Sequence, residues 1–381
     1  MTSRAPASNS TARSAERIED LCAAGLPAQE LITGVADELR RTLSADSLFV
    51  CATDPDTMLG MGAGVVHGMP ESVCEPFWAF EFEVPDYNKF TDLAHGPRHA
   101  ADLHAATGGR PERSARWREL RTLMDADAEL RASLTANGRG WGLLHVNRVG
   151  GVRGFSEAEV AFVESVGSAI GRGLRDALVS QPADGLVGRG PGMAVFDAEN
   201  RLVSATTEAI AWFEEIESVR RLPKLPSAVG VPSEVIVAAQ EARARAADPG
   251  AALLPTRTRA RTSTGAWLLI HASCLRAAGG SADHTAVVVE PAKASEVAPL
   301  IVEAYELTPR EVEVTRAVAR GLTTPEVAAE LHLSRYTVAD HLKSVYEKVG
   351  VSTRGELVAK MFADHYHDRL AAAVQPARAA A

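Results

Sequence analysis

The chain has 381 residues, of which 46% are hydrophobic and 23% are charged, and its formal net charge is −9 at pH 7. A chain of this length can bury two or three separate cores, while its acidic balance excludes general electrostatic attraction to nucleic acid or anionic membranes. Because no stretch approaches about eighteen consecutive apolar residues and the N-terminus lacks the apolar core of a signal peptide, the sequence predicts a cytoplasmic protein with no membrane contact.

Residues 1–15 are rich in Ser, Ala, Thr and Arg without apolar periodicity, so they are predicted to form a disordered arm. A globular region then covers residues 16–180. Apolar residues at helical spacing predict one helix around Ile18–Cys22 and a second over Leu31–Leu43. A long helix capped by Ser156 closes the region. Strands are predicted over Ser47–Thr53, Thr57–Val66 and Trp141–Val149.

The end of this region carries a recognisable order of elements. A strand ends in Asn147-Arg148, and after a loop Phe155-Ser156 begin the closing helix. This order is similar to the end of a GAF domain, an α+β sensor module with a central antiparallel sheet, which implies a GAF-like domain over residues 16–180. We expect the closing helix to pair with its twin in a homodimer through an apolar stripe. The stripe consists of Val160, Val163, Val166, Ile170 and Leu174.

Aromatic side chains gather just before residue 90, at Phe77, Trp78, Phe80 and Phe82. Sensor modules of this kind use apolar cavities, so one interpretation is a pocket for an unidentified small-molecule ligand. The favoured interpretation is that these rings make strand and core contacts, as large aromatic residues commonly do.

The front half shows no metal or catalytic signature. Gly96 and Pro97 interrupt any helix that would bring His95 and His99 together, so these residues and His104 are predicted to lie in a surface loop. No P-loop, GxSxG or HExxH motif is present, and the glycines at 60–64 lack the spacing of a dinucleotide loop. The sequence therefore predicts no catalytic residue, no metal site, no cofactor and no enzymatic activity. The cysteines have no paired spacing, which predicts reduced thiols, and they are Cys22, Cys51, Cys74 and Cys274.

A Pro/Gly-rich linker at about 180–190 precedes a second region, residues 188–292. It opens with predicted strands at Met193–Phe196 and Leu202–Ser204 and a helix through Ala209 and Trp212. This order is similar to the start of a PAS domain, which implies a second α+β domain, PAS-like. Three later strands are predicted over Leu254–Ser263, Trp267–Leu275 and Thr285–Glu290.

The most informative block lies in residues 300–367, before a low-complexity tail at 371–381 that is predicted to be disordered. Thr308 and Glu311 form a capping box around a proline, and Ser334 caps a third helix that Gly350 ends. A second capping box at 353–356 begins a fourth helix. The third helix has one buried stripe, formed by Val338, Leu342, Val345 and Val349.

These residues resemble the DNA-binding domain of LuxR-type transcriptional regulators. The likeness runs from Leu307-Thr308-Pro309-Arg310-Glu311 through Gly321 to Arg354 and Glu356, and it covers too many positions for a chance match. The implied fold class is multidomain: a GAF-like domain, a PAS-like domain and an all-α four-helix helix-turn-helix domain. The helix-turn-helix motif comprises Thr324, Pro325, Glu326, Val327, Ala328, Leu331, Ser334, Val338, His341 and Leu342.

The resemblance implies that the third helix, Ser334–Val349, lies in the major groove of double-stranded DNA. Ala339, Asp340 and Lys343 would then face base edges. Asp340 would either accept from a cytosine amino group or remain solvated. His341 is expected to pack or to face phosphates rather than bind metal. The other expected DNA-binding residues are Arg335, Thr337, Ser344, Lys348 and Arg354.

The net charge of the C-terminal region affects how strongly it is expected to bind DNA. Residues 296–370 contain nine Lys or Arg and twelve Asp or Glu, so a monomer should bind DNA weakly and affinity should depend on homodimerisation. The alternative is a helix-turn-helix used as a protein-interaction module. In the regulator interpretation, the sensor domains control DNA binding through helices at about 155–178 and 295–306, and contact with RNA polymerase is compatible with it.

Overall fold

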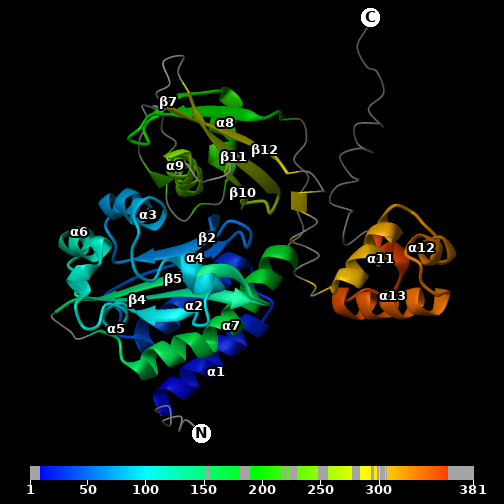
Figure 1. Cartoon of the computed structure of the whole chain (residues 1–381), viewed down its shortest axis with the longest axis horizontal. Coiled ribbons are helices and arrows are strands. Elements are labelled where there is room, and N and C mark those ends of the chain that lie inside the picture. Colours follow the sequence, from blue (N-terminus) through cyan, green and yellow to red (C-terminus); the bar gives the residue numbers. More distant parts are fainter. Residues whose placement is uncertain are drawn as a thin grey trace, which may run out of the picture. The chain divides into compact units, whose positions relative to one another are not determined.

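The computed structural model describes residues 9–150, 154–180, 189–216, 218, 221–222, 230–247, 256–276, 284–292, 296–297, 300, 305 and 307–358. The chain forms two compact units (Figure 1). The N-terminal unit comprises Met1–Ser180, Gly190–Ser263 and Leu268–Glu290, and the C-terminal unit comprises Gln181–Arg189, Thr264–Trp267 and Pro291–Ala381. The predicted tail at 371–381 and most of the predicted coupling segment 295–306 lie outside the described residues.

The first sheet of the N-terminal unit has five strands in the order β2-β1-β5-β4-β3. Its strands are β1 (Ser47–Thr53), β2 (Gly60–His67), β3 (Ala100–Asp102), β4 (Ala128–Ala136) and β5 (Arg139–Arg148). Helices α1 (Asn9–Ala23), α2 (Ala28–Thr42) and α7 (Glu157–Ser180) pack together on one face (Figure 1). The remaining helices are α3 (Cys74–Phe82), α4 (Phe90–His95), α5 (Leu103–Ala106) and α6 (Ala115–Met124), with short 3-10 turns at Glu71–Val73 and Pro111–Arg113.

Side-chain alternation along the strands gives the two faces of this sheet different chemistry. The register pairs Leu48 with Val146 and Val50 with Leu144, so one face is aliphatic. On the other face Phe49 pairs with His145, and charged residues of β4 lie beside them. Since successive residues of a strand point to opposite faces, the aliphatic set meets the helix layer and the polar set faces away from it.

The predicted closing helix is confirmed as α7, but its stripe is not a free surface. Val166 and Ile170 are each 1% exposed, because α7 lies against β4 and β5 and is also covered by α1. The prediction that this stripe pairs with a second copy is therefore wrong: the chain's own sheet buries it. Charged substitutions at Val166 or Ile170 would disrupt the core rather than separate two protomers.

One further prediction needs correction in this unit. Helix α1 begins at Asn9, so residues 9–15 are helical rather than disordered; Ser14 is buried and donates to Glu38 Oε1 at 2.6 Å. Composition alone does not reveal such tertiary contacts.

The prediction that the aromatic rings make strand and core contacts is confirmed for Phe77 and Trp78. Both residues lie on helix α3 and are buried, and each ring meets Phe49 of β1 edge-on.

The second sheet of the N-terminal unit has the order β10-β11-β12-β6-β7. The two five-stranded sheets share one feature of strand order. In each sheet, the strand that comes first in the sequence lies between the strand that comes second and the strand that comes last: β1 lies between β2 and β5, and β6 lies between β7 and β12. The predicted strands of residues 188–292 are confirmed, with boundaries shifted by a few residues at most. They are β6 (Gly192–Phe196), β7 (Leu202–Ala205), β10 (Thr256–Arg261), β11 (Trp267–Leu275) and β12 (His284–Pro291), accompanied by α8 (Thr207–Glu215), α9 (Ser233–Ala247) and a small ladder of β8 (Arg221–Leu222) with β9 (Val231–Pro232).

The C-terminal unit contains α11 (Pro309–Ala319), α12 (Thr324–Glu330) and α13 (Arg335–Val349), followed by a helical turn at 354–358. Both capping boxes at Thr308 and Thr323 form, and Gly350 ends α13 in the left-handed conformation with φ +67°. The predicted fourth helix begins at this turn, and the rest of that prediction lies outside the described residues. The core joins the three helices through Val314, Val318, Val327, Val338, Leu342, Val345 and Val349.

Candidate nucleic-acid interface and sensor region

Helices α12 and α13 form the turn that defines the motif. His332 adopts φ +53° in the connection, and the Leu333 amide donates to the Ala328 carbonyl at 2.9 Å. Ser334 then caps α13, where its Oγ accepts from the Thr337 amide at 3.1 Å. Val327 and Val338 are fully buried between the helices. The apolar motif residues thus hold α13 at a fixed angle, and Glu326 and Ser334 take part in capping α12 and α13.

One face of α13 remains exposed. It presents Arg335, Ala339, Asp340 and Lys343, which the sequence assigned to DNA, together with Tyr336. Positions three and four apart share a helix face, so these side chains form one surface. Tyr336 is 86% exposed, and it was not among the expected DNA-binding residues. The sequence contained one indication of this exposed side chain: a large aromatic residue outside the apolar stripe of the helix.

Other predicted contact residues are engaged inside the domain. Ser344 Oγ donates to Glu311 Oε1 at 2.6 Å, and Lys348 Nζ donates to Glu311 Oε2 at 2.7 Å. Arg354 donates to the carbonyl of Val318 at 3.3 Å and also to that of Leu322. Thr337 is half-buried beside Ser334, with the two hydroxyls 2.8 Å apart. Their part in DNA binding stays a prediction.

Glu311 ties the start of α11 to the end of α13. Its side chain also accepts from the Thr308 amide at 2.7 Å, which completes the capping box. Burial opposes its ionisation, but hydrogen bonds from Lys348, Ser344 and Thr308 prevail and lower the pKa of Glu311 to about 2. The carboxylate is therefore charged at neutral pH, and it fixes the orientation of the exposed face of α13.

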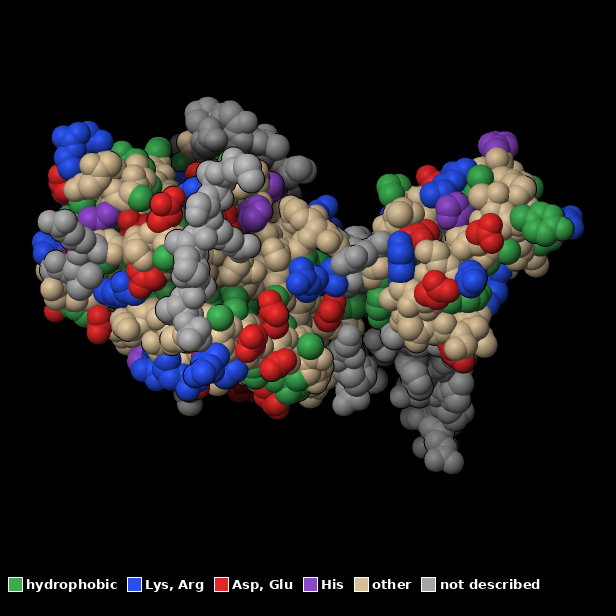
Figure 2. Space-filling view, turned by 90° about the horizontal axis from the view of Figure 1, so that it is seen from below, with side chains coloured by type: hydrophobic (Ala, Val, Ile, Leu, Met, Phe, Trp, Pro, Cys, Tyr) green, Lys and Arg blue, Asp and Glu red, His purple; other side chains and the backbone are tan. Residues whose placement is uncertain are grey.

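The surface of this domain carries both signs of charge. Basic and acidic side chains lie interspersed over the face of the C-terminal domain seen at the right of Figure 2. Arg310 pairs with Glu313, and Arg320 pairs with Glu330. Within residues 307–358, no ion pair engages Arg335 or Lys343, so these two of the three cations of α13 remain available to a phosphate or base.

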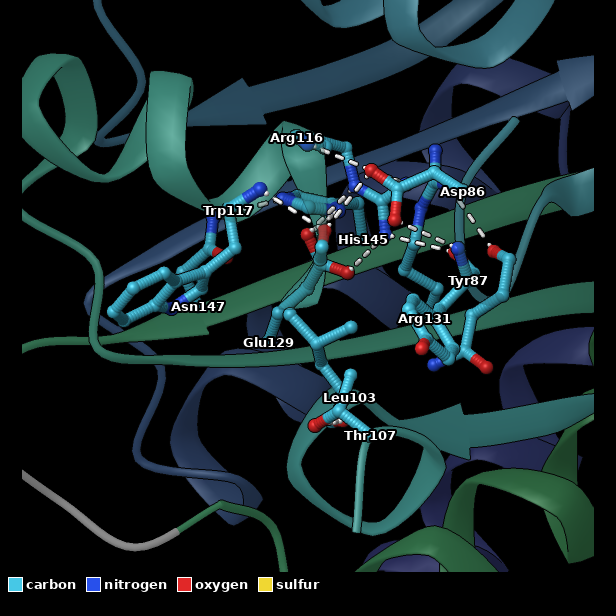
Figure 3. Close-up of polar contacts among 12 residues, drawn as sticks. Asp86, Tyr87, Leu103, Thr107, Arg116, Trp117, Glu129, Arg131, His145 and Asn147 are labelled. Atoms are coloured by element: carbon cyan, nitrogen blue, oxygen red, sulfur yellow. Dashed lines mark hydrogen bonds and ion pairs between the residues drawn. The ribbon is translucent and has the colours of Figure 1, made fainter. Parts of the chain in front are cut away.

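A buried charge network lies on the face of the first sheet that carries Phe49 and His145 (Figure 3). Arg116 lies between Asp86 and Glu129, and its guanidinium donates to both Glu129 oxygens, at 2.6 and 3.0 Å. Arg131 pairs with Glu81 at 3.0 Å and lies over the Phe90 ring, 3.7 Å from its centroid. Both arginines are fully buried.

In this network, burial and ion pairing have opposite effects on the pKa values of the charged groups. Burial opposes the charge of Glu129, yet the adjacent Arg116 holds the pKa of Glu129 down to about 2. Burial lowers the pKa of Arg131 to about 10 and that of His145 to about 3. At neutral pH the arginines and Glu129 are thus charged, and His145 is neutral.

Among the described residues, no group of three or more His, Cys, Asp or Glu side chains is placed to hold a metal ion. His95 Nδ1 lies 2.8 Å from the Thr91 carbonyl, and His99 Nδ1 lies 2.8 Å from that of Leu93. Among the same residues, no helix combines the length and hydrophobicity needed to cross a bilayer.

The thiols of Cys22 and Cys51 should be unreactive in the folded protein. Burial raises the pKa of Cys22 to about 12 and that of Cys51 well above its ordinary value. Because the thiolate is the nucleophile, we expect iodoacetamide at pH 8 to modify both only after unfolding in urea. Peptide mass spectrometry measures the two rates, and native alkylation of Cys51 at the unfolded rate would contradict this expectation.

Comparison with known proteins identifies the C-terminal domain. Residues 305–361 match the family model of bacterial regulatory proteins, luxR family. The probable transcriptional regulatory protein SgaR of Hyphomicrobium methylovorum is 49% identical over 53 residues, which are 14% of this chain and 25% of SgaR. UhpA of Escherichia coli is 46% identical over 56 residues, which are 15% of this chain and 29% of UhpA. The C-terminal domain is a luxR-family helix-turn-helix domain, and the chain spans about a quarter of the length of these relatives.

The likeness of this chain to solved structures is distant. The GAF domain of a phosphoenolpyruvate-protein phosphotransferase from Coxiella burnetii has a TM-score of 0.34 and 16% identity, covering 45% of this chain and 96% of that domain. The VqmA dimer of Vibrio cholerae has a TM-score of 0.21 and 14% identity, covering 47% of this chain and 84% of VqmA. Likeness at this level carries no functional argument.

Proposed function

We propose that this protein is a sequence-specific DNA-binding transcription regulator whose helix α13 enters the major groove. The observation that carries the proposal is that the buried and the exposed side chains of α13 have different roles. Its apolar stripe is buried and Glu311 fixes its far end, while Arg335, Ala339, Asp340 and Lys343 stay exposed on one surface. A luxR-family domain with this exposed helix face fits the way helix-turn-helix proteins read base edges.

Within this proposal the exposed residues divide by chemistry. Lys343 suits a guanine edge or a phosphate, and Arg335 at the start of the helix suits a phosphate. Asp340 suits a cytosine amino group. Ser344, Lys348 and Arg354 act by holding the domain together, since each is bonded within it.

The remaining features of the proposal concern assembly and control. Two copies would bind a roughly palindromic site, because one domain with so few unpaired cations neutralises few phosphates. The GAF-like domain, and a PAS-like domain at 188–292 supported by its strand order, would bias this equilibrium through a ligand with different affinity for the two states. RNA polymerase contact would follow from a regulatory role.

Replacing Lys343 with alanine is expected to weaken binding to a specific DNA site by about 1–3 kcal/mol, the usual worth of a base contact. Fluorescence anisotropy of a labelled site measures the change. Arg121→Ala in α6 of the N-terminal unit removes the same charge and should leave affinity unchanged. Equal losses in the two variants would show that net charge, rather than the α13 surface, sets affinity.

The acidic balance of residues 296–370 favours a second candidate, a helix-turn-helix used for protein contacts. The dependence of affinity on salt concentration distinguishes the two candidate functions. A DNA complex loses affinity steeply between about 50 and 200 mM salt because counterions are released on binding. A protein complex held by apolar burial would keep its affinity over that range.

A further inference from the structure

A large aromatic side chain stands in solvent at the start of α13. Tyr336, in the first turn of the helix, is 86% exposed, more than any other large hydrophobic residue that the structure describes. Among the described residues, no hydrogen bond, ion pair or ring contact engages its side chain. A tyrosine ring offers a large apolar area, and the core of this domain leaves that area unused.

Tyr336 extends the exposed surface of α13 towards the start of the helix. Ala339, Asp340 and Lys343 follow it by three, four and seven residues, and all four side chains are exposed. Residues at these spacings lie on one face of an α-helix. Because a helix rises about 1.5 Å per residue, Tyr336 and Lys343 mark two ends of this face that are about 10 Å apart.

The position of Tyr336 in the helix decides what its ring would meet. In helix-turn-helix proteins, the residues near the start of the recognition helix are the ones that contact base edges in the major groove. The ring carries no charge with which to neutralise a phosphate, and the neighbouring Arg335 supplies such a charge. Thymine alone of the four bases presents an apolar group in the major groove, its 5-methyl group.

We propose that Tyr336 reads a thymine, with its ring packed against the 5-methyl group of that base. This inference rests on the proposed function, in which α13 enters the major groove. The exposed face of α13 then reads DNA by apolar contact at Tyr336 and by hydrogen bonding at Lys343. Since successive base pairs are about 3.4 Å apart, the thymine should lie within about four base pairs of the position that Lys343 reads.

Replacing thymine with uracil tests the contact, because uracil pairs with adenine in the same way and lacks only the methyl group. Selection from a randomised library of DNA duplexes by the full chain at low salt first supplies the site. Each thymine of that site is then replaced in turn, and competition in a mobility-shift assay measures affinity. One thymine in each half-site is expected to lose about fourfold on replacement, the effect of removing one buried methyl group.

Three variants of α13 connect this loss to the tyrosine ring. Tyr336→Ala should bind the thymine and uracil forms of that position equally, whereas Tyr336→Phe should keep the fourfold difference because only the hydroxyl is lost. Lys343→Ala is the matched control on the same face: it should weaken binding to both forms and keep their ratio. Tyr336 is so exposed that neither replacement disturbs the core of the domain.

The possible outcomes separate this inference from the proposed function. If Tyr336→Ala shows the same uracil effects as the unchanged chain, or if no uracil replacement in a selected site matters, the inference is overturned and the regulator function stands. Loss of the effect in Tyr336→Phe would also overturn it, because the hydroxyl would then make the contact. Failure of the unchanged chain to select any shared sequence would overturn both.

Discussion

Replacing Glu129 with glutamine is expected to destabilise the N-terminal unit by about 3–5 kcal/mol, which makes it one of the most damaging single changes in the chain. The substitution keeps the shape of the side chain but removes the charge that pairs with the buried Arg116 guanidinium. The nearest remaining anion, Asp86, lies 3.8 Å from Arg116. The variant thus leaves the buried Arg116 with a more distant ion-pair partner, and a poorly compensated buried cation costs far more than the hydrogen bond itself.

Urea unfolding followed by tryptophan fluorescence measures this loss, because Trp141 is buried in the same sheet. Arg121→Ala is the control: it breaks the Arg121–Asp127 pair, whose arginine is 52% exposed, and should cost less than about 1 kcal/mol. A loss in Glu129→Gln as small as that of the control would mean that the network contributes little to stability.

The charge network also predicts that the folded N-terminal unit loses stability at low pH. The pKa of Glu129 is about 2 in the folded protein, below its ordinary value of 4.5. The stabilisation is therefore complete above about pH 4.5 and is lost as pH falls towards 2, since protonation then favours the unfolded chain. Glu129→Gln should flatten that part of the stability curve.

The second large effect is expected in the C-terminal domain on replacing Glu311 with glutamine. The variant loses the ion pair to Lys348 and weakens the bonds to Ser344 and the Thr308 cap. We expect a loss of about 2–3 kcal/mol in local stability, within the range for charge-assisted hydrogen bonds. Hydrogen exchange of the α11 and α13 amides, followed by mass spectrometry on the full chain, reports on this domain alone.

Glu313→Gln provides a control on the same helix. Its exposed pair with Arg310 should contribute less than about 1 kcal/mol. The pKa of Glu311 is about 2, lower than the ordinary 4.5, so its contribution should vanish as pH falls between these values. Equal exchange rates in the two variants would show that Glu311 does not hold α13 in place.

Much of the fold could be predicted because local signals agreed with tertiary structure. The caps at Thr308 and Ser334 and the stripe of α13 depend on neighbours within one or two turns. Strand β11 was predicted with its observed boundaries because most of its residues are apolar and Gly265 marks its start. Strand β4 was missed, since Glu129 and Arg131 break its apolar pattern and only distant partners make their burial tolerable.

The functional surfaces were only partly predictable for the same reason. Motif position placed Lys343 on the exposed face of α13 but could not show that Lys348, five residues later, turns inward to Glu311. The buried ion pair of Arg259 with Asp54 was harder still to predict, because the two residues are 205 positions apart in sequence. Long-range contacts of this kind have no local signature.

Selection of genomic DNA fragments by the purified full chain, beside an Arg335→Ala/Lys343→Ala variant, tests the central claim most directly. If α13 reads DNA, the unchanged protein should enrich fragments that share a roughly palindromic site, and the variant should lose that enrichment. The same fragments recovered by both proteins, or no shared sequence at low salt, would contradict the assignment of α13 as the reading helix.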